Sequence, residues 1–172
     1  MTQRVELAAV MDRLAIDALI TEYAVTVDDG DWDAYRRLFS PGGRADYRSA
    51  GGIEGAADDV ATWMTETLRM FSMRQHLIVN RRLEFGTLEQ DVGDTARVRA
   101  DYVNPMAFVT DGADGADADG KDGKERAAKG TPEPDFVCGG RYSFGLLRTH
   151  SGWRLREVVV AEKWRRITQH AG

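Results

Sequence analysis

The chain has 172 residues, of which 42% are hydrophobic and 30% charged, and its formal net charge is −5. This length suits a single domain over residues 1–172 with one core, and an acidic chain offers no basic field to nucleic acid or anionic lipid. The N-terminus lacks the apolar stretch of a signal peptide, and no run approaches the ~20 apolar residues that span a bilayer, so we expect a cytoplasmic protein without membrane segments.

The first third of the chain has the periodicity of α-helices. An apolar stripe alternates with charged residues from about residue 5 to residue 28, which predicts one long helix. Asp29-Gly30 is typical of a turn, and Asp31 is well placed to cap a second helix from Trp32 to Phe39. A short strand over residues 44–47 and a third helix over about residues 55–71 follow. The expected stripe of the first helix consists of Met11, Leu14, Leu19, Tyr23 and Val27.

The period then changes to that of β-strands. Four long segments rich in Val, Leu, Tyr, Phe and Trp are predicted strands, over residues 74–85, 96–108, 136–149 and 153–164. Helices followed by a meander of long strands indicate an α+β fold, in which a cone-shaped, curved antiparallel sheet wraps around the N-terminal helices and encloses a pocket. Alternation in the first long strand places Leu77, Val79, Leu83 and Phe85 on one face and His76, Ile78 and Asn80 on the other.

One segment, Asp111 to Asp135, breaks this pattern. It consists almost wholly of Asp, Gly, Ala, Lys and Pro, which cannot bury enough surface to offset the entropy of ordering, so we predict a disordered loop insertion between two strands. The stretch 117–122 is similar in composition to a calcium loop. It lacks a regular set of ligands ending in a bidentate Glu, and disorder is the better interpretation.

Asp28 is a carboxylate without an evident structural role. It lies at the end of the first predicted helix, where a negative charge meets the negative pole of the helix dipole at a cost of about 0.3–1 kcal/mol. His76, at the start of the first long strand, is the candidate partner, although its mixed strand face fits both a polar pocket and solvent exposure. A carboxylate beside a histidine fixes the tautomer of the ring and creates a pair that can abstract a proton.

Further polar residues could face the same cavity. Tyr23 lies five positions before Asp28, or ~140° around a regular helix, so the two share a site only if the helix end distorts; otherwise Tyr23 is a core aromatic. Tyr47 on the short strand has the same two interpretations. The later strands contribute Tyr102, Asn104, Tyr142 and Arg148 as candidate binding residues.

Other types of site have no sequence support. The chain has no glycine-rich phosphate loop, no Gly-x-Ser-x-Gly elbow, no His-Glu-x-x-His and no Rossmann fingerprint. The single cysteine, Cys138, precludes an internal disulfide and is expected to be a small buried hydrophobe. His150 falls in a predicted turn and His170 in the C-terminal tail. We therefore expect neither metal nor cofactor, which leaves acid–base chemistry or simple binding.

Several stretches of the chain, in this order and spacing, resemble the SnoaL-like family of the nuclear transport factor 2-like superfamily. The resemblance covers nearly the whole chain except residues 111–135, and it implies a cone-shaped fold. Its pieces are Val27-Asp28 ahead of Asp31-Trp32, the stretch 46–49, Arg74-Gln75-His76 with 80–85 behind it, and Arg141-Tyr142 leading to Leu147-Arg148 and Gly152-Trp153.

Within this superfamily the chain resembles three eliminating enzymes. Residues 27–49 are most similar to scytalone dehydratase, whose catalytic Asp, Tyr and His fall by resemblance on Asp28, Tyr47 and His76. Hexachlorocyclohexane dehydrochlorinase has an Asp–His dyad that falls on the same pair, with an Arg that aligns best with Arg148. Bile acid 7α-dehydratase places a Tyr five residues before its Asp, as Tyr23 is here.

The chain also departs from these enzymes. Where scytalone dehydratase has a second His, this chain offers Asn104 or nearby residues. The later Ser and Asn ligands of scytalone dehydratase align with Gly140 and Tyr142 of this chain. The dehydrochlorinase has Lys in place of Tyr23. The substrate is therefore not carried over, and cyclisation, which related polyketide cyclases perform with an Asp/His pair, stays open beside elimination and isomerisation.

Residues and resemblance together predict a cofactor-independent, lyase-like enzyme (dehydratase, isomerase or polyketide-cyclase type) that acts on an apolar, ring-containing small molecule. The alternative is a non-catalytic member of the fold that binds a small ligand or serves as a scaffold. A carboxylate oxygen of Asp28 within hydrogen-bonding reach of His76, facing an enclosed cavity, favours the enzyme. The open sheet face also predicts a homodimer or homotrimer.

Overall fold

The computed structural model describes residues 2–109 and 133–168; most of the predicted loop insertion, and His170, lie outside this range. Within the described residues, no helix is long and apolar enough to cross a membrane. The main helices are α1 (Thr2–Asp29), α2 (Trp32–Arg37) and α3 (Ala57–Thr67). The strands are β1 (Phe39–Asp46), β2 (Glu54–Ala56), β3 (Phe71–Arg74), β4 (Leu77–Phe85), β5 (Thr95–Phe108), β6 (Phe136–Thr149) and β7 (Gly152–Ile167).

The strands form one curved sheet in the order β2-β1-β7-β6-β5-β3, with β4 also paired to β5. The predicted α+β architecture is confirmed, and the long strands pair antiparallel as expected. The sheet is nevertheless mixed, because β1 runs parallel to β7. The expectation of a wholly antiparallel sheet was wrong at this edge. No hairpin joins β1 to β7, so their direction is free of the constraint that a tight turn imposes on consecutive strands.

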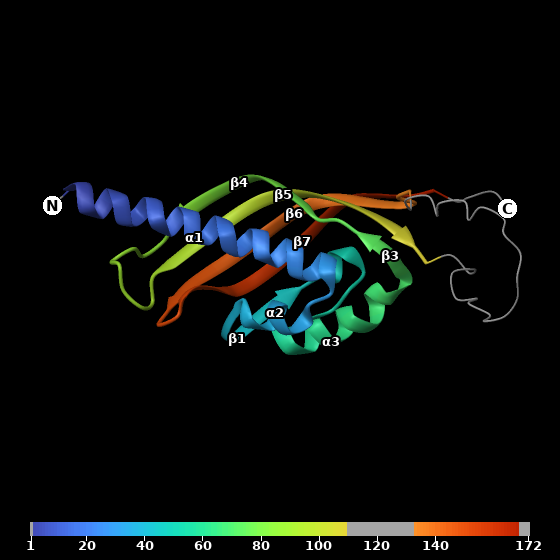
Figure 1. Cartoon of the computed structure of the whole chain (residues 1–172), viewed down its shortest axis with the longest axis horizontal. Coiled ribbons are helices and arrows are strands. Elements are labelled where there is room, and N and C mark those ends of the chain that lie inside the picture. Colours follow the sequence, from blue (N-terminus) through green and yellow to red (C-terminus); the bar gives the residue numbers. More distant parts are fainter. Residues whose placement is uncertain (1, 110–132, 169–172) are drawn as a thin grey trace, which may run out of the picture.

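Helix α1 lies across one face of the sheet, and its C-terminal end contacts α2, which packs against α3 and β1 (Figure 1). Its buried stripe consists of Ile16, Leu19, Ile20, Tyr23 and Val27. Met11 and Leu14, which the periodicity placed on the same stripe, are instead exposed, because the side of the helix that packs on the sheet continues through Asp12, whose carboxylate is bonded to Trp153, and Met11 and Leu14 lie on other sides of the helix. The predicted cap is present, since the Ala34 N–H donates to Asp31 Oδ1 over 2.8 Å.

Two predicted helix ends differ from the structure. The second helix ends at Arg37 and Phe39 already begins β1, so Pro41 and the glycines after it lie inside a strand, where the register with β7 breaks. The third helix covers residues 57–67 only. A 3-10 turn, Leu68–Met70, follows it, and Phe71 then opens β3.

The predicted strand over residues 74–85 is two strands, β3 and β4, that lie end to end along β5. The break falls opposite Pro105, which accepts a hydrogen bond from the Gln75 N–H over 3.1 Å but has no N–H to donate in return. The ladder therefore stops at residues 75 and 76. This interruption frees the backbone of His76 for another partner.

A second irregularity reverses the faces expected for β4. Between Val79 and Arg82 the strand holds one more residue than β5 opposite, and Asn80 takes a positive φ of 52°. Ile78 before this bulge and Leu83 after it both face the core, whereas Leu77 and Val79 are exposed. The predicted grouping of Leu77 and Val79 with Leu83 and Phe85 was wrong, because a strict alternation cannot represent a bulge.

Candidate active site

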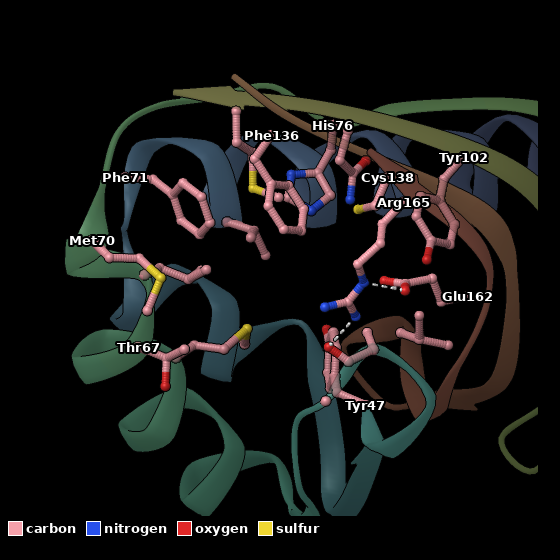
Figure 2. A pocket seen from close by; sticks show the side chains of 18 of the residues that line it. Tyr47, Thr67, Met70, Phe71, His76, Tyr102, Phe136, Cys138, Glu162 and Arg165 are labelled. Carbon is pink, nitrogen blue, oxygen red and sulfur yellow. Dashed lines mark hydrogen bonds and ion pairs between the residues drawn. The ribbon is translucent and has the colours of Figure 1, made fainter. Parts of the chain in front are cut away.

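A cavity of about 210 Å³ lies between the sheet and helix α3 (Figure 2). One part of its wall is apolar and comes mostly from α3, β3 and the ends of β5 and β6, with Trp63, Met64, Leu68, Phe71, Met106 and Phe136. The other part carries polar groups, from Tyr47, His76, Tyr102, Asn104, Tyr142, Glu162 and Arg165. Such a division of apolar walls and few convergent polar groups is typical of small-molecule sites.

Asp28 and His76 form a double contact at this cavity. Asp28 Oδ1 lies 2.5 Å from His76 Nδ1, and Asp28 Oδ2 accepts the backbone N–H of His76 over 2.8 Å. An ionised carboxylate can only accept hydrogen bonds, so Nδ1 carries the ring proton and Nε2 is the nitrogen with a free lone pair. The side chain of His76 is 8% exposed and the ring lines the cavity (Figure 2).

The neighbours of Asp28 explain how a carboxylate is held at a helix C-terminus. Arg74 donates from Nη2 to the carbonyl of Asp28 over 3.0 Å and from Nη1 to the carbonyl of Leu68 over 2.9 Å. A guanidinium on the last carbonyls of a helix counters the negative dipole end and satisfies an unpaired acceptor. The side chain of Asp28 accepts its hydrogen bonds from His76, whose backbone N–H has no partner in the sheet because the ladder is interrupted at Pro105.

Tyr47 lines the cavity, and its hydroxyl is hydrogen-bonded to the hydroxyl of Tyr23. Tyr23 itself is fully buried behind Tyr47, where its ring packs edge-on against Tyr142 and Phe144. Helix α1 stays regular to Asp29, so the distortion considered for Tyr23 is absent, and this residue reaches the site only through Tyr47. Burial raises the pKa of both hydroxyls well above the ordinary value, which keeps them protonated donors near neutral pH.

Tyr102, Asn104 and Tyr142, the candidate binding residues of the later strands, are buried and line the same cavity. Burial raises the pKa of Tyr102 and of Tyr142 above the usual range. Asn104 Oδ1 has no hydrogen-bonding partner among the described residues. A buried acceptor left without a partner costs about 1–3 kcal/mol, so this edge of the cavity suits a bound group that can hydrogen-bond to Asn104.

Arg148 does not reach the cavity. It donates from Nη2 to Asp12 over 2.7 Å and from Nε to Asp94 over 3.0 Å, and its guanidinium lies over the ring of Trp153. This cluster joins α1 to the β4–β5 turn and the β6–β7 hairpin, away from the residues that line the cavity. We expected Arg148 to contact the substrate. In the structure its guanidinium is instead hydrogen-bonded to two buried carboxylates, which is a structural role.

Sequence reasoning missed Glu162 and Arg165, which both line the cavity from β7. Residues three apart in a regular strand face opposite sides. Here Gly140 pairs with Glu162 but Gly139 pairs with Trp164, so Lys163 is an extra residue that brings Glu162 and Arg165 to the same side.

The Gly139-Gly140 pair permits this bulge. A Cβ on Gly139 would lie 2.4 Å from the Trp164 ring, and one on Gly140 would lie 2.2 Å from the Ala161 carbonyl. Two glycines inside a strand were therefore the sequence signal for a bulge.

Cys138 is buried beside the cavity as predicted, and burial raises the pKa of its thiol to about 11. Over residues 2–109 and 133–168, no three His, Cys, Asp or Glu side chains cluster in a way that could hold a metal ion. His150 is exposed at the β6–β7 turn. The groups at the cavity able to take part in proton transfer or oxyanion binding are thus the Asp28–His76 pair and the nearby hydroxyl, amide, carboxylate and guanidinium groups.

Known proteins share this fold. The chain is 28% identical over 160 residues to an uncharacterized protein of Mycobacterium tuberculosis H37Rv, which covers 93% of this chain and 91% of the relative. A hexachlorocyclohexane dehydrochlorinase of Novosphingobium barchaimii LL02 matches with a TM-score of 0.69 and 13% identity, over 97% of this chain and 99% of that one. A candidate scytalone dehydratase of Novosphingobium aromaticivorans also gives a TM-score of 0.69, with 16% identity, over 100% and 95%.

These likenesses confirm the predicted cone-shaped fold, in which helices cover one face of an open, curved sheet. The family model for the SnoaL-like domain matches residues 8–159, a range that includes Asp28, His76 and most of the cavity wall. The chain belongs to the SnoaL-like domain family.

Proposed function

We propose that the chain is a cofactor-independent acid–base enzyme of the lyase type. It removes a carbon-bound proton from an apolar, ring-containing small molecule and so drives elimination, isomerisation or cyclisation. The observation that carries this proposal is the double contact of Asp28 with His76, which leaves His76 Nε2 without a partner among the described residues at the wall of a cavity. A non-catalytic binding protein has no need of an oriented, carboxylate-bound imidazole at that position.

His76 acts as the general base in this mechanism. Asp28 holds the proton on Nδ1, so the lone pair of Nε2 meets the substrate, and the carboxylate stabilises the imidazolium that forms when the proton is taken. Tyr47 donates a hydrogen bond to a carbonyl or leaving oxygen. Tyr23 orients the Tyr47 hydroxyl from behind. The carbon-bound proton thus moves to Nε2, and the electron pair of the broken C–H bond stays with the substrate.

The volume of the cavity suits a small ring compound. An apolar cavity of ~150 Å³ is known to hold benzene, so a space of about 210 Å³ suits one ring or two fused rings. Rings pack against Trp63, Phe71 and Phe136, and polar substituents meet Asn104 and the tyrosines. The names of the solved relatives, a dehydrochlorinase and a candidate dehydratase, support an eliminating enzyme on such compounds.

The proposal is tested by proton abstraction itself. A two-ring ketone such as 2-tetralone is incubated with the protein in D₂O, and deuterium entering the carbon beside the carbonyl is followed by mass spectrometry. General acid–base catalysis contributes ~10²–10⁴-fold, so His76→Ala and Asp28→Asn should each slow the exchange by about that factor. His150→Ala, at an exposed turn, is the matched control and should exchange like the wild type.

Two outcomes would contradict this reasoning. Exchange that is unchanged in both His76→Ala and Asp28→Asn would remove the pair from the chemistry. Wild-type protein that binds 2-tetralone and related hydroxylated or halogenated one- and two-ring compounds, yet exchanges and eliminates none of them, would favour the alternative of a small-ligand-binding member of the fold.

Exposed apolar side chains support the further proposal of a homodimer or homotrimer. Leu77 and Val79 lie on the outer face of the sheet, each 46% exposed. Leu7, Met11 and Leu14 form a second exposed stripe on α1. Large exposed apolar patches mark sites of contact between protein chains, and an assembly that covers these side chains would remove them from water.

A further inference from the structure

We propose that Arg165 is the electrophile of the site, whose guanidinium binds the substrate oxygen that becomes negative when His76 removes the proton. The inference rests on the proposed function and deepens it, because it names a second reacting group and the class of substrate. That class is a ring compound with a carbonyl group next to the carbon that loses its proton.

The guanidinium of Arg165 is held on two sides. Nε donates to Glu162 Oε1 over 2.7 Å, and Nη2 donates to the carbonyl of Ala50 over 3.1 Å. Nη1 has no hydrogen-bonding partner among the described residues, and Figure 2 shows this end of the side chain projecting into the cavity. A planar guanidinium with five donors, fixed by two of them, presents the others in a set direction.

His76 and Arg165 face one cavity from different parts of the sheet. His76 comes from the junction of β3 and β4, and Arg165 from the end of β7, beyond the bulge at Lys163. The Ala50 carbonyl that holds Arg165 belongs to the turn directly after Tyr47. Figure 2 accordingly shows Arg165 near Tyr47, with His76 across the cavity from them. A substrate between them would have a base on one side and two donors on the other.

The charge of Glu162 affects which type of substrate oxygen Arg165 binds. The side chain of Glu162 is 11% exposed and that of Arg165 is 42% exposed, and the carboxylate compensates the charge of the guanidinium, so the resting pair is nearly neutral. The site then has little attraction for a permanently charged carboxylate. It still offers preorganised donors to a neutral carbonyl oxygen, and these bind more tightly as negative charge develops there.

Proton abstraction converts the ketone into an enolate. The C–H bond beside the carbonyl breaks, and its proton goes to His76 Nε2. The electron pair forms a carbon–carbon double bond while the carbonyl π electrons move to oxygen, which gives an enolate hydrogen-bonded to Arg165 and Tyr47. Collapse of the enolate either expels a leaving group from the next carbon, which is elimination, or, where a further carbon–carbon double bond is conjugated with the enolate, takes the proton back from His76 at the far carbon of that bond, which is isomerisation.

The test uses 4-nitrophenol, whose neutral and ionised forms absorb at different wavelengths, as a stand-in for the enolate. Its pKa when bound is measured by titrating the absorbance of the saturated complex. An arginine next to an anion lowers the pKa of its acid by about 1–3 units, so Arg165→Met should raise the pKa of bound nitrophenol by that amount. Glu162→Gln removes the compensating charge and should lower it. Arg166→Met, an exposed neighbour, should leave it unchanged.

The same titration is repeated in a His76→Ala background, where the effect of Arg165→Met on the nitrophenol pKa should persist, because it does not depend on the base. In a separate experiment, the single variant Arg165→Met should exchange 2-tetralone about 10²–10³-fold more slowly than the wild type.

Equal pKa values of bound nitrophenol in the wild type and Arg165→Met would overturn the inference. So would a wild type with no saturable binding of nitrophenol. If Arg165 shifts the nitrophenol pKa but His76→Ala exchanges normally, the oxyanion site stands and the proposed function fails.

Discussion

Arg148→Met separates a structural role of this residue from the substrate contact that its sequence context implied. The substitution keeps most of the side-chain length and removes the charge. It abolishes the hydrogen bonds of 2.7 Å to Asp12 and 3.0 Å to Asp94, together with the contact over Trp153. The side chains of Asp12 and Asp94 are 7% and 2% exposed, so both carboxylates lose their buried counter-charge.

The expected cost follows from these contacts. Removing one partner of a buried ion pair costs ~3–5 kcal/mol. Asp94 keeps the backbone N–H groups of Glu89 and Gln90, and Asp12 keeps the indole of Trp153, so neither carboxylate is left without a donor. We therefore expect the lower end, about 3 kcal/mol, which corresponds to a fall in Tm of about 6–12 °C for a chain of this size.

Urea unfolding followed by tryptophan fluorescence measures this free energy, and the pKa of bound 4-nitrophenol reports on the cavity in the same variant. The matched control is Arg156→Met, an exposed arginine of β7, which should change the free energy of unfolding by less than about 0.5 kcal/mol. A small effect of Arg148→Met on stability combined with loss of nitrophenol binding would refute the reasoning and return Arg148 to the substrate.

Acid should weaken the same cluster. Burial raises the pKa of Asp12 and of Asp94, but the hydrogen bonds and charge of Arg148, with other donors, outweigh it and hold both below the ordinary value of 3.8. Their contribution to stability is thus fully present above that value and is lost as the pH falls through the folded pKa, so unfolding free energies should be level from neutral pH to mildly acidic pH and then drop; a decline that begins near neutrality would contradict this. The proposed homodimer or homotrimer should appear in size-exclusion chromatography with light scattering, and Leu77→Glu should shift it toward the monomer; a wild-type monomer at micromolar concentration would refute the assembly.

Periodicity and end signals were enough to predict the regular parts of the molecule. Strand β6 has the predicted bounds, and the cap at Asp31 forms as its position implied. The contact of Asp28 with His76 was expected from resemblance to known enzymes and from the odd position of a carboxylate at a helix end. Only the fold shows why the carboxylate of Asp28 is tolerated at the helix end. The backbone N–H of His76 donates to this carboxylate, and the guanidinium of Arg74 donates to the backbone carbonyl of Asp28.

The parts that could not be predicted are places where the sheet departs from alternation, and two of these departures, at His76 and at Lys163, bring residues to the cavity. The Asn80 bulge lets Ile78 and Leu83 face the core together, the break opposite Pro105 turns the backbone of His76 toward Asp28, and the bulge at Lys163 places Glu162 beside Arg165. Alternation follows from the backbone of each strand alone, whereas a bulge depends on the partner strand, so even Gly139-Gly140, which signals a bulge, does not tell which residues of β7 it brings to one side. In a regular sheet, Ile78 and Leu83 would face opposite sides, and so would Glu162 and Arg165. Polar groups can converge on this cavity because the strands lose their register beside it.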